Sequence, residues 1–309
     1  MLHDRNHSPT LICFLTIVMF TGSRRDANGN GRKRMKQYAE KIFKPLPLLP
    51  FGRGILLRFF MLPNFLLTKA YGLENLAGTE SARIYAFNHN NSLEILMVPV
   101  LIIYHLGGRM ISFVIDWMYG KVPVLGSLMD LTDPVYVYHK RSPLRWIESK
   151  RLSGPADNTV ERCTEKLRAG QSIGIFPEGT RNRNPENLLK GKPGIGHIAL
   201  KTGVAVVPVG IDFECRRKKG RIPVLGRTIV RIGKPLDFRR QSEHYLALAA
   251  GERKNNNSSE LNRMAAHVTH EIMLSLAELS GKRYCETFAE KRTRIPEPTI
   301  KPKEQICRL

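Results

Sequence analysis

From residue 82 onward, short apolar runs alternate with amphipathic stretches along the chain. The apolar runs predict strands at Arg83–Asn88, Ile111–Ile115, Val135–Tyr138, Ser172–Phe176 and Val204–Gly210, with Thr228–Ile232 as an edge strand. Helices are predicted at Ser92–Leu106, bent near Pro99, and at Asn158–Ala169, Ile195–Lys201 and Leu261–Leu279. This alternation predicts an α/β fold: a single domain in which a mixed central sheet is wrapped by helices.

The two ends of the chain and one internal stretch are polar. The run Gly251–Glu260, GERKNNNSSE, predicts a loop before the last helix. The tail, residues 286–309, is basic and contains prolines, which predicts a mobile segment. Residues 1–34 form a basic leader and residues 35–75 an apolar segment, so the folded domain is expected to cover residues 76–285.

The leader contains one apolar run, Leu11–Phe20. This run is too short to span a bilayer as a helix, which needs roughly 20 residues. Basic residues dominate the next stretch, Arg24–Lys44, as they do where an apolar anchor is held on the cytoplasmic side of a membrane. A second interpretation also stands: translation begins at Met35, and the first 34 residues are not part of the protein.

The segment Pro45–Leu73 is rich in Leu and Phe and is interrupted by Pro50 and Pro63. Two short apolar helices with basic residues at their margins are expected here, and such helices lie in the interface of a membrane. The alternative is a helical hairpin buried in the protein. The first interpretation predicts N-terminal membrane-associated helices.

Charge and cysteine usage narrow the environment. Lys and Arg number 49 against 27 Asp and Glu, which gives a net charge of +22 and requires an anionic partner. No zinc-finger, RNA-binding or basic-zipper signature supports nucleic acid, so an anionic membrane surface is the expected partner. The five cysteines form no CxxC pair, which argues against disulfides and a structural metal and indicates a reducing, cytosolic environment.

The first candidate motif is FNHNNSLEI, at Phe87–Ile95. His89 follows a predicted strand, and Glu94 lies on the first turn of the next predicted helix, so the two side chains can meet. A carboxylate holds a histidine in one tautomer and stabilises its protonated form, as a base that activates an alcohol requires. In the alternative, Asn91 and Glu94 form a capping box and serve only the helix terminus.

The second candidate motif is FPEGTRNRN, at Phe176–Asn184, directly after a predicted strand. Ligands of open α/β sheets bind beyond the carboxyl ends of the strands. Arg181 and Arg183 lie in this loop, and a guanidinium fork there suits a phosphate group. The alternative is a solvated turn that happens to contain arginines.

Taken in order, FNHNNSLE, YGKVPVLGSLMDLTDPVYVYHKR, FPEGTRNRN and GVAVVPVGI resemble the glycerolipid acyltransferase family, which includes 1-acylglycerol-3-phosphate acyltransferase. The resemblance covers roughly Tyr71–Leu236, about half of the chain. It implies the site residues by their positions in these motifs. His89 would be the general base and Glu94 its acidic partner; the substrate-binding residues would be Glu178, Gly179, Thr180, Arg181, Lys140, Arg141 and Pro208.

The resemblance also gives these residues separate roles. Arg181 would bind the acceptor phosphate, Glu178 and Gly179 would shape the loop around the reacting centre, and Pro208 would help to form the acyl site. Backbone N–H groups around Gly179 are candidate donors to the oxyanion.

Two positions depart from the family pattern. Glu94 stands where the family usually has aspartate, one methylene shorter. Asp116 and Trp117 occupy the region where the second motif usually begins with a phosphate-binding lysine. Either Lys121 or the Lys140–Arg141 pair compensates, or the acceptor lacks the usual glycerol phosphate.

The resemblance implies transfer of a fatty acyl group from acyl-CoA or acyl carrier protein to a lipid hydroxyl, with no cofactor or metal. The expected acceptor is 1-acylglycerol-3-phosphate, which gives phosphatidic acid in phospholipid biosynthesis. Two alternatives stand: acylation of another lipid hydroxyl, as in a glycolipid, an ornithine lipid or a carotenoid glycoside, and a non-catalytic basic protein that binds membranes. The expected location is the cytoplasmic face of a membrane, with peripheral or monotopic attachment.

Overall fold

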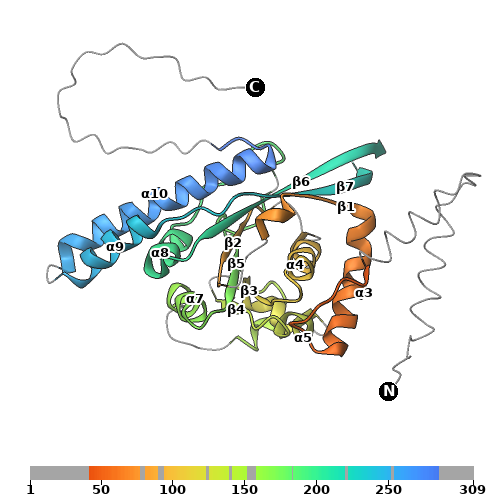
Figure 1. The fold of residues 1–309 in the computed structure, drawn as a ribbon, viewed down its shortest axis with the longest axis horizontal. Coiled ribbons are helices and arrows are strands. Elements are labelled where there is room, and N and C mark those ends of the chain that lie inside the picture. The colour runs from red at the N-terminus through yellow and green to blue at the C-terminus, as the bar shows by residue number, and fades with distance from the viewer. Residues whose placement is uncertain are drawn as a thin grey trace, which may run out of the picture.

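The computed structural model describes residues 42–76, 81–89, 94–122, 125–138, 141–151, 158–182, 184–219, 222–251 and 254–284. These residues form one α/β domain, with helices on both faces of a single sheet (Figure 1). The predicted leader and the predicted tail lie outside them. Within the described ranges, every helix falls short of the length and apolarity that crossing a bilayer demands.

The sheet has seven strands in the order β1-β7-β6-β2-β5-β3-β4. Their bounds are β1 Thr68–Tyr71, β2 Ile84–Phe87, β3 Ile111–Asp116, β4 Val135–Val137, β5 Ser172–Ile175, β6 Val206–Lys219 and β7 Ile222–Ile232. Every neighbouring pair is parallel except β6 and β7, which are antiparallel, so the predicted mixed sheet is confirmed. Because β6, β2, β5, β3 and β4 run in one direction, their carboxyl ends share one edge of the sheet.

The helices form two layers. One face of the sheet is covered by α3 (Phe51–Leu67) and α4 (Glu94–His105), and we call it the α3–α4 face. The other is covered by α7 (Thr159–Arg168), α8 (Gly194–Thr202), α9 (Arg239–Ala250) and α10 (Lys254–Ser280), and we call it the α10 face. Short helices and turns complete the fold: η1 Leu73–Leu76, η2 Trp117–Lys121, α5 Leu125–Asp130 and α6 Arg145–Glu148.

The central strand β2 shows why its sequence is apolar throughout. Ile84 and Ala86 pack into the core of the α10 face, and Tyr85 and Phe87 into the core of the α3–α4 face. All four residues have no exposed surface. Strands covered on both faces have continuous apolar runs rather than alternating ones.

The segment Pro45–Leu73 differs from its prediction. Instead of two short helices, one helix, α3, continues through Pro63 and is followed by strand β1. A proline removes one hydrogen bond inside a helix. Here the helix is held by packing of Leu57 and Met61 in the core, and by the Asn64 side chain, whose Nδ2 donates to the Met97 carbonyl at 3.0 Å.

Two further predictions are wrong. Thr228–Ile232 is no edge strand, because β7 lies between β6 and β1. The predicted loop Gly251–Glu260 is helical from Lys254, where α10 begins. In it, Asn257 Nδ2 donates to the Leu248 carbonyl at 2.8 Å and binds the preceding helix, α9, which the sequence pattern did not predict. Hydrophilic composition alone therefore does not exclude a helix that is held by its neighbours.

Candidate active site

The candidate base lies where β2 ends, at the edge formed by the carboxyl ends of the parallel strands. Asn88, the last residue before His89, is fully buried. Its Nδ2 donates to the Ile211 carbonyl at 2.8 Å, and its Oδ1 accepts from the Ile211 N–H at 2.6 Å. This side chain continues the β2–β6 pairing by one step, so the backbone that enters His89 is fixed.

The backbone of His89 joins the first motif to the second. Its N–H donates to Glu178 Oε1 at 2.9 Å, and its carbonyl accepts from the Asn182 N–H at 2.8 Å. Glu178 and Asn182 lie on either side of Thr180 and Arg181 in the loop after β5. The structure therefore brings together the two motifs that the sequence singled out, 89 positions apart in the case of His89 and Glu178.

The Glu178 side chain links His89 to the far end of this loop by hydrogen bonds. The side chain is 2% exposed, and its second carboxylate oxygen accepts from the Leu189 N–H at 2.9 Å. Burial raises the pKa of the Glu178 carboxyl, although its backbone donors and the positive charge of Lys282 act in the opposite direction. Its carboxylate therefore accepts hydrogen bonds from the backbone on both sides of the loop.

The imidazole of His89 lies against an aromatic ring. The side chain is mostly buried, and its ring centroid is 4.8 Å from that of Phe176. Phe176 follows β5 directly and also contacts Phe87, with ring centroids 5.4 Å apart. The ring of Phe176 therefore lies between the candidate base and the core of the α3–α4 face.

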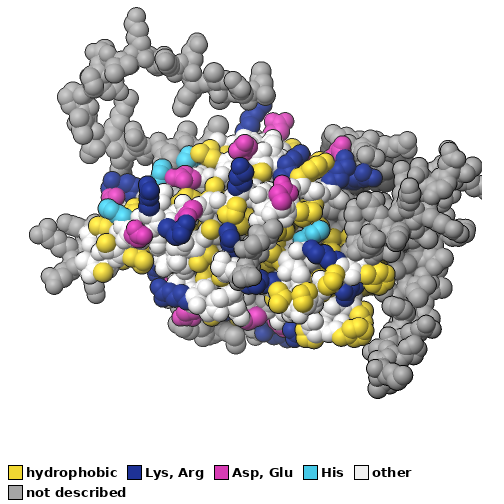
Figure 2. Space-filling model, viewed as in Figure 1, with side chains coloured by type: hydrophobic (Ala, Val, Ile, Leu, Met, Phe, Trp, Pro, Cys, Tyr) yellow, Lys and Arg dark blue, Asp and Glu magenta, His cyan; other side chains and the backbone are white. Residues whose placement is uncertain are grey.

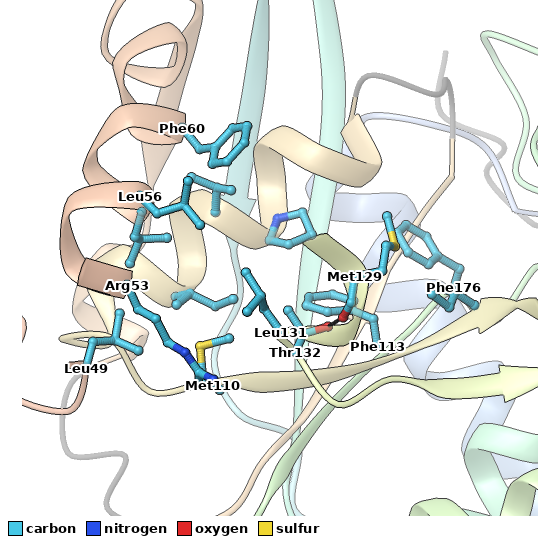
Figure 3. A pocket seen from close by; sticks show the side chains of 15 residues that line it. Leu49, Arg53, Leu56, Phe60, Met110, Phe113, Met129, Leu131, Thr132 and Phe176 are labelled. Atoms are coloured by element: carbon cyan, nitrogen blue, oxygen red, sulfur yellow. Dashed lines mark hydrogen bonds between the residues drawn. The ribbon is translucent and has the colours of Figure 1, made fainter. Parts of the chain in front are cut away.

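A cavity of about 100 Å³ opens on that face and extends to the same ring. All of its lining side chains are apolar except Arg53 and Thr132. They come from α3, α4, β3 and α5 and the residues next to these elements, and from Phe176 after β5. In Figure 3 Phe176 lies at the opposite end of the group from Leu49 and Arg53. An apolar cavity that ends beside a histidine can hold a hydrocarbon chain with its polar end at the imidazole.

Gly179 forms the turn of the second motif. Its φ of +64° lies in the left-handed region, which glycine adopts without strain. Its N–H donates to the Phe176 carbonyl at 2.9 Å, so this group closes the turn. Thr180 and Arg181 follow on the surface, where the side chains are exposed to solvent at the edge of the sheet.

The remaining predicted site residues either lie outside the described residues or are placed elsewhere in the fold. The side chain of Glu94 and all of Lys140 lie outside the described residues, as does Arg183, so the expected contact of Glu94 with His89 stays a prediction. Arg141 follows β4, the outermost strand, with β3 and β5 between β4 and β2. Pro208 pairs with Ala86 inside the sheet, and its ring adjoins Gly233 near Leu279 of α10, on the face away from the cavity.

A buried tryptophan and an aspartate occupy the region where the family usually has a lysine. Trp117 is 1% exposed, and its ring stacks on Tyr138 with centroids 5.8 Å apart. Asp116 ends β3 at the same edge of the sheet as His89. Lys121, one candidate for compensation, is exposed at the end of η2.

Three residues important to this geometry were not predicted as site residues: Asn88, Phe176 and Asn182. The sequence places Asn88 between a strand and the histidine, and Phe176 between a strand and a proline. Those positions are visible in the pattern, but the partners of these residues are distant in the sequence. No grouping of three or more potential metal ligands occurs among the described side chains.

Comparison with known proteins agrees with these motifs. The sequence model of the family described as Acyltransferase matches residues 68–212. A chloroplastic 1-acyl-sn-glycerol-3-phosphate acyltransferase of Arabidopsis thaliana is 31% identical over 178 residues, which are 58% of this chain and 41% of that protein. A lyso-ornithine lipid O-acyltransferase of Pseudomonas aeruginosa is 35% identical over 101 residues, which are 30% of this chain and 39% of that protein.

The crystal structure of a 1-acyl-sn-glycerophosphate acyltransferase from Thermotoga maritima aligns with 87% of this chain and 90% of its own, at 19% identity and a TM-score of 0.46. The chain spans about two fifths of the length of the Arabidopsis and Pseudomonas relatives. The matched residues contain both motifs, from the strand before His89 to the strand that bears Pro208. Residues 68–212, just under half of the chain, match the acyltransferase family.

Proposed function

We propose that this protein transfers a fatty acyl group from an acyl thioester to the hydroxyl of 1-acylglycerol-3-phosphate, with His89 as the general base. One observation carries the proposal, the position of His89. Its ring contacts Phe176, which lines the apolar cavity, and the His89 backbone is hydrogen-bonded to the loop that bears Arg181. The proposal makes His89 the base, the cavity the place of the acyl chain and Arg181 the phosphate-binding side chain, all at the edge where β2 and β5 end. The relative from Arabidopsis, which is named for this acceptor, supports the same choice.

In the proposed reaction, His89 takes the proton of the acceptor hydroxyl as the oxygen attacks the thioester carbonyl. The C–O bond forms, the C–S bond breaks, and the thiolate takes up the proton from the imidazolium. Glu94 would orient the imidazole and stabilise its charged form. Acyl-CoA and acyl carrier protein both supply such a thioester, and the cavity beside Phe176 would hold the acyl chain.

The acceptor defines a second candidate function. Asp116 at the sheet edge, in the region of a family lysine, favours an acceptor other than a glycerol phosphate, and one relative is named for lyso-ornithine lipid. A panel of lysophosphatidate, lyso-ornithine lipid and a neutral monoacyl lipid, each offered with a radiolabelled acyl thioester, separates the two. Arg181→Ala should raise the KM for lysophosphatidate about tenfold to a hundredfold and leave the KM of the acyl donor unchanged.

The base is tested by His89→Ala, with His244→Ala on the exposed surface of α9 as the matched control. Loss of a general base should lower kcat by about 10²- to 10⁴-fold, whereas the control should keep wild-type rates. Circular dichroism and the unfolding midpoint check that the fold is retained. Near-normal activity of a folded His89→Ala protein would refute the mechanism.

We also propose peripheral or monotopic attachment to the cytoplasmic face of a membrane through α3. Phe51, Ile55 and Phe59 recur every four residues along this helix and are 81%, 41% and 51% exposed. Figure 2 shows hydrophobic side chains gathered over α3 with Lys and Arg beside them. Exposed apolar side chains flanked by basic ones fit the interface of an anionic bilayer, and the net charge of +22 favours such a surface.

Vesicle flotation tests the attachment. Replacing Phe51, Ile55 and Phe59 together by Ser should weaken binding to anionic vesicles at least about tenfold, since each apolar side chain contributes about 1.5–3 kcal/mol when fully buried. Leu246 and Leu274, which are exposed on α9 and α10, give the matched control when both are changed to Ser. Equal loss in the two variants, or equal wild-type binding to neutral and anionic vesicles at low salt, would contradict the proposal.

A further inference from the structure

A lysine outside the two motifs lies against the second of them. A Cβ atom added to Gly179 would be 2.7 Å from Cε and 2.8 Å from Nζ of Lys192. Real Cβ atoms do not approach other atoms so closely, so the space where a side chain at position 179 would lie is filled by the end of the Lys192 side chain. Its ammonium group therefore lies on the turn that leads to Arg181.

The position of Lys192 is set by its backbone. Its N–H donates to the Pro177 carbonyl at 2.8 Å, which ties residue 192 to the beginning of the same loop. Pro193 and helix α8 follow immediately, and they fix the direction in which the chain leaves. The backbone that bears the side chain is thus anchored beside the loop.

The charge of Lys192 is not neutralised by the loop. The side chain is exposed, and within the described part of the chain no acceptor is recorded for its ammonium group. The neighbouring carboxylate of Glu178 is buried and accepts from two backbone N–H groups, those of His89 and Leu189. An open cation thus remains beside Gly179, two positions before Arg181.

We propose that Lys192 is the second cation of the acceptor-phosphate site and acts together with Arg181. This assignment rests on the proposed function. In it, Lys192 supplies the positive charge that the family usually has from a lysine in the region of Asp116 and Trp117. A phosphate monoester carries nearly two negative charges at pH 7, so one guanidinium does not balance it. Arginine provides a directional fork and lysine a compact point charge, and the two are complementary at one phosphate group.

The position of Lys192 gives a second reason for glycine at position 179. The φ of +64° already favours glycine, and the ammonium of Lys192 occupies the space that any side chain there would need. Gly179→Ala should therefore displace the ammonium as well as strain the turn. Its acceptor KM should rise, with a smaller change in the KM of the acyl donor.

The test compares Lys192→Met with Lys234→Met in the full chain, assayed in mixed micelles with lysophosphatidate and a radiolabelled acyl thioester. Lys234 is exposed and lies two residues before Leu236, which pairs with Val206 at the start of β6, away from the His89 edge. Each variant removes one positive charge. Lys192→Met should raise the lysophosphatidate KM about tenfold to a hundredfold, with kcat within about threefold and the KM of the donor unchanged.

Lys192→Arg should recover most of the loss, because it restores a cation on a long side chain. An acceptor KM for Lys192→Met within twofold of the Lys234→Met value overturns the assignment and leaves the proposed function standing. A lower unfolding midpoint without a change in acceptor KM identifies a purely structural role and overturns it as well. A wild-type protein that acylates no lysophosphatidate instead refutes the proposed acceptor, and the assignment with it.

Discussion

The two faces of the sheet are covered in different ways. Four helices close the α10 face, where Ile198, Ile272 and Leu276 have at most 1% of their surface exposed. Among the described residues, α3 and α4 cover the α3–α4 face, which contains the apolar cavity and, on the outer side of α3, the exposed residues Phe51 and Phe59. Both faces are rich in Leu and Ile, so these residue types do not distinguish them.

The difference in packing indicates that one face serves mainly stability and the other mainly ligand binding. A closely packed core contributes most of the burial that stabilises a domain. A face that keeps a cavity gives up part of that packing and gains space for an apolar ligand. We therefore expect changes on the α10 face to act on stability, and changes on the α3–α4 face to act on substrate use.

The largest difference is expected from side-chain truncation. Ile272→Ala on the α10 face removes a fully buried side chain and should lower the free energy of unfolding by about 2–5 kcal/mol. Leu56→Ala removes a side chain that lines the cavity and is 37% exposed, so it should cost under about 1.5 kcal/mol. Urea denaturation measures both values. Equal losses would show that the α3–α4 face is as tightly packed as the other.

Enlarging a side chain sharpens the comparison. Val268→Phe places extra volume in the buried core of the α10 face, where overpacking should cost about 1–3 kcal/mol. Val100→Phe adds the same volume beside the cavity and should be tolerated. It should also lower kcat/KM for long-chain acyl donors more than for short-chain ones, measured with a series of acyl thioesters. A uniform change across chain lengths would mean that the cavity does not hold the acyl chain.

The sequence predicted the elements whose residues face the core on both sides. Strands such as β2 and β5 are short, continuous apolar runs, and this pattern is typical of strands that are buried on both faces. Helix α3 was predicted as two helices because Pro63 is a strong local signal against continuation, and its packing against α4 is invisible in a sequence. For the same reason α10 was predicted to begin too late: its first turns are hydrophilic.

The candidate site was predicted by residue type but not by contact. His89 and the FPEGTRNRN loop were singled out because each follows a predicted strand and both match motifs of the family that the sequence resembles. The bond from the His89 N–H to Glu178 joins residues 89 positions apart, and no local pattern encodes it. Phe176 and Lys192 illustrate the same limit, since each matters only through the neighbour that the fold provides.

A pH-dependent effect is expected on the α3–α4 face. His105 ends α4, and burial, helped by the positive charge of Lys44, lowers its pKa to about 4. Lys44 Nζ donates to the His105 carbonyl at 3.2 Å, so the two groups are held together. A helix C-terminus favours a protonated histidine, but here desolvation and the neighbouring ammonium are the stronger influences.

The direction in which stability changes with pH follows from the pKa of His105 in the folded and in the unfolded chain. In the unfolded chain the histidine pKa is about 6.5, so between pH 6.5 and 4 the unfolded chain binds more protons than the folded one. Stability should therefore fall as the pH is lowered through this window, with a slope below about 1.4 kcal/mol per pH unit from this residue. His105→Gln should flatten the dependence, whereas His244→Gln on the α10 face, exposed on α9, should leave it unchanged. Thermal unfolding at half-unit pH steps provides the measurement, and parallel curves for all three proteins would show that His105 does not contribute.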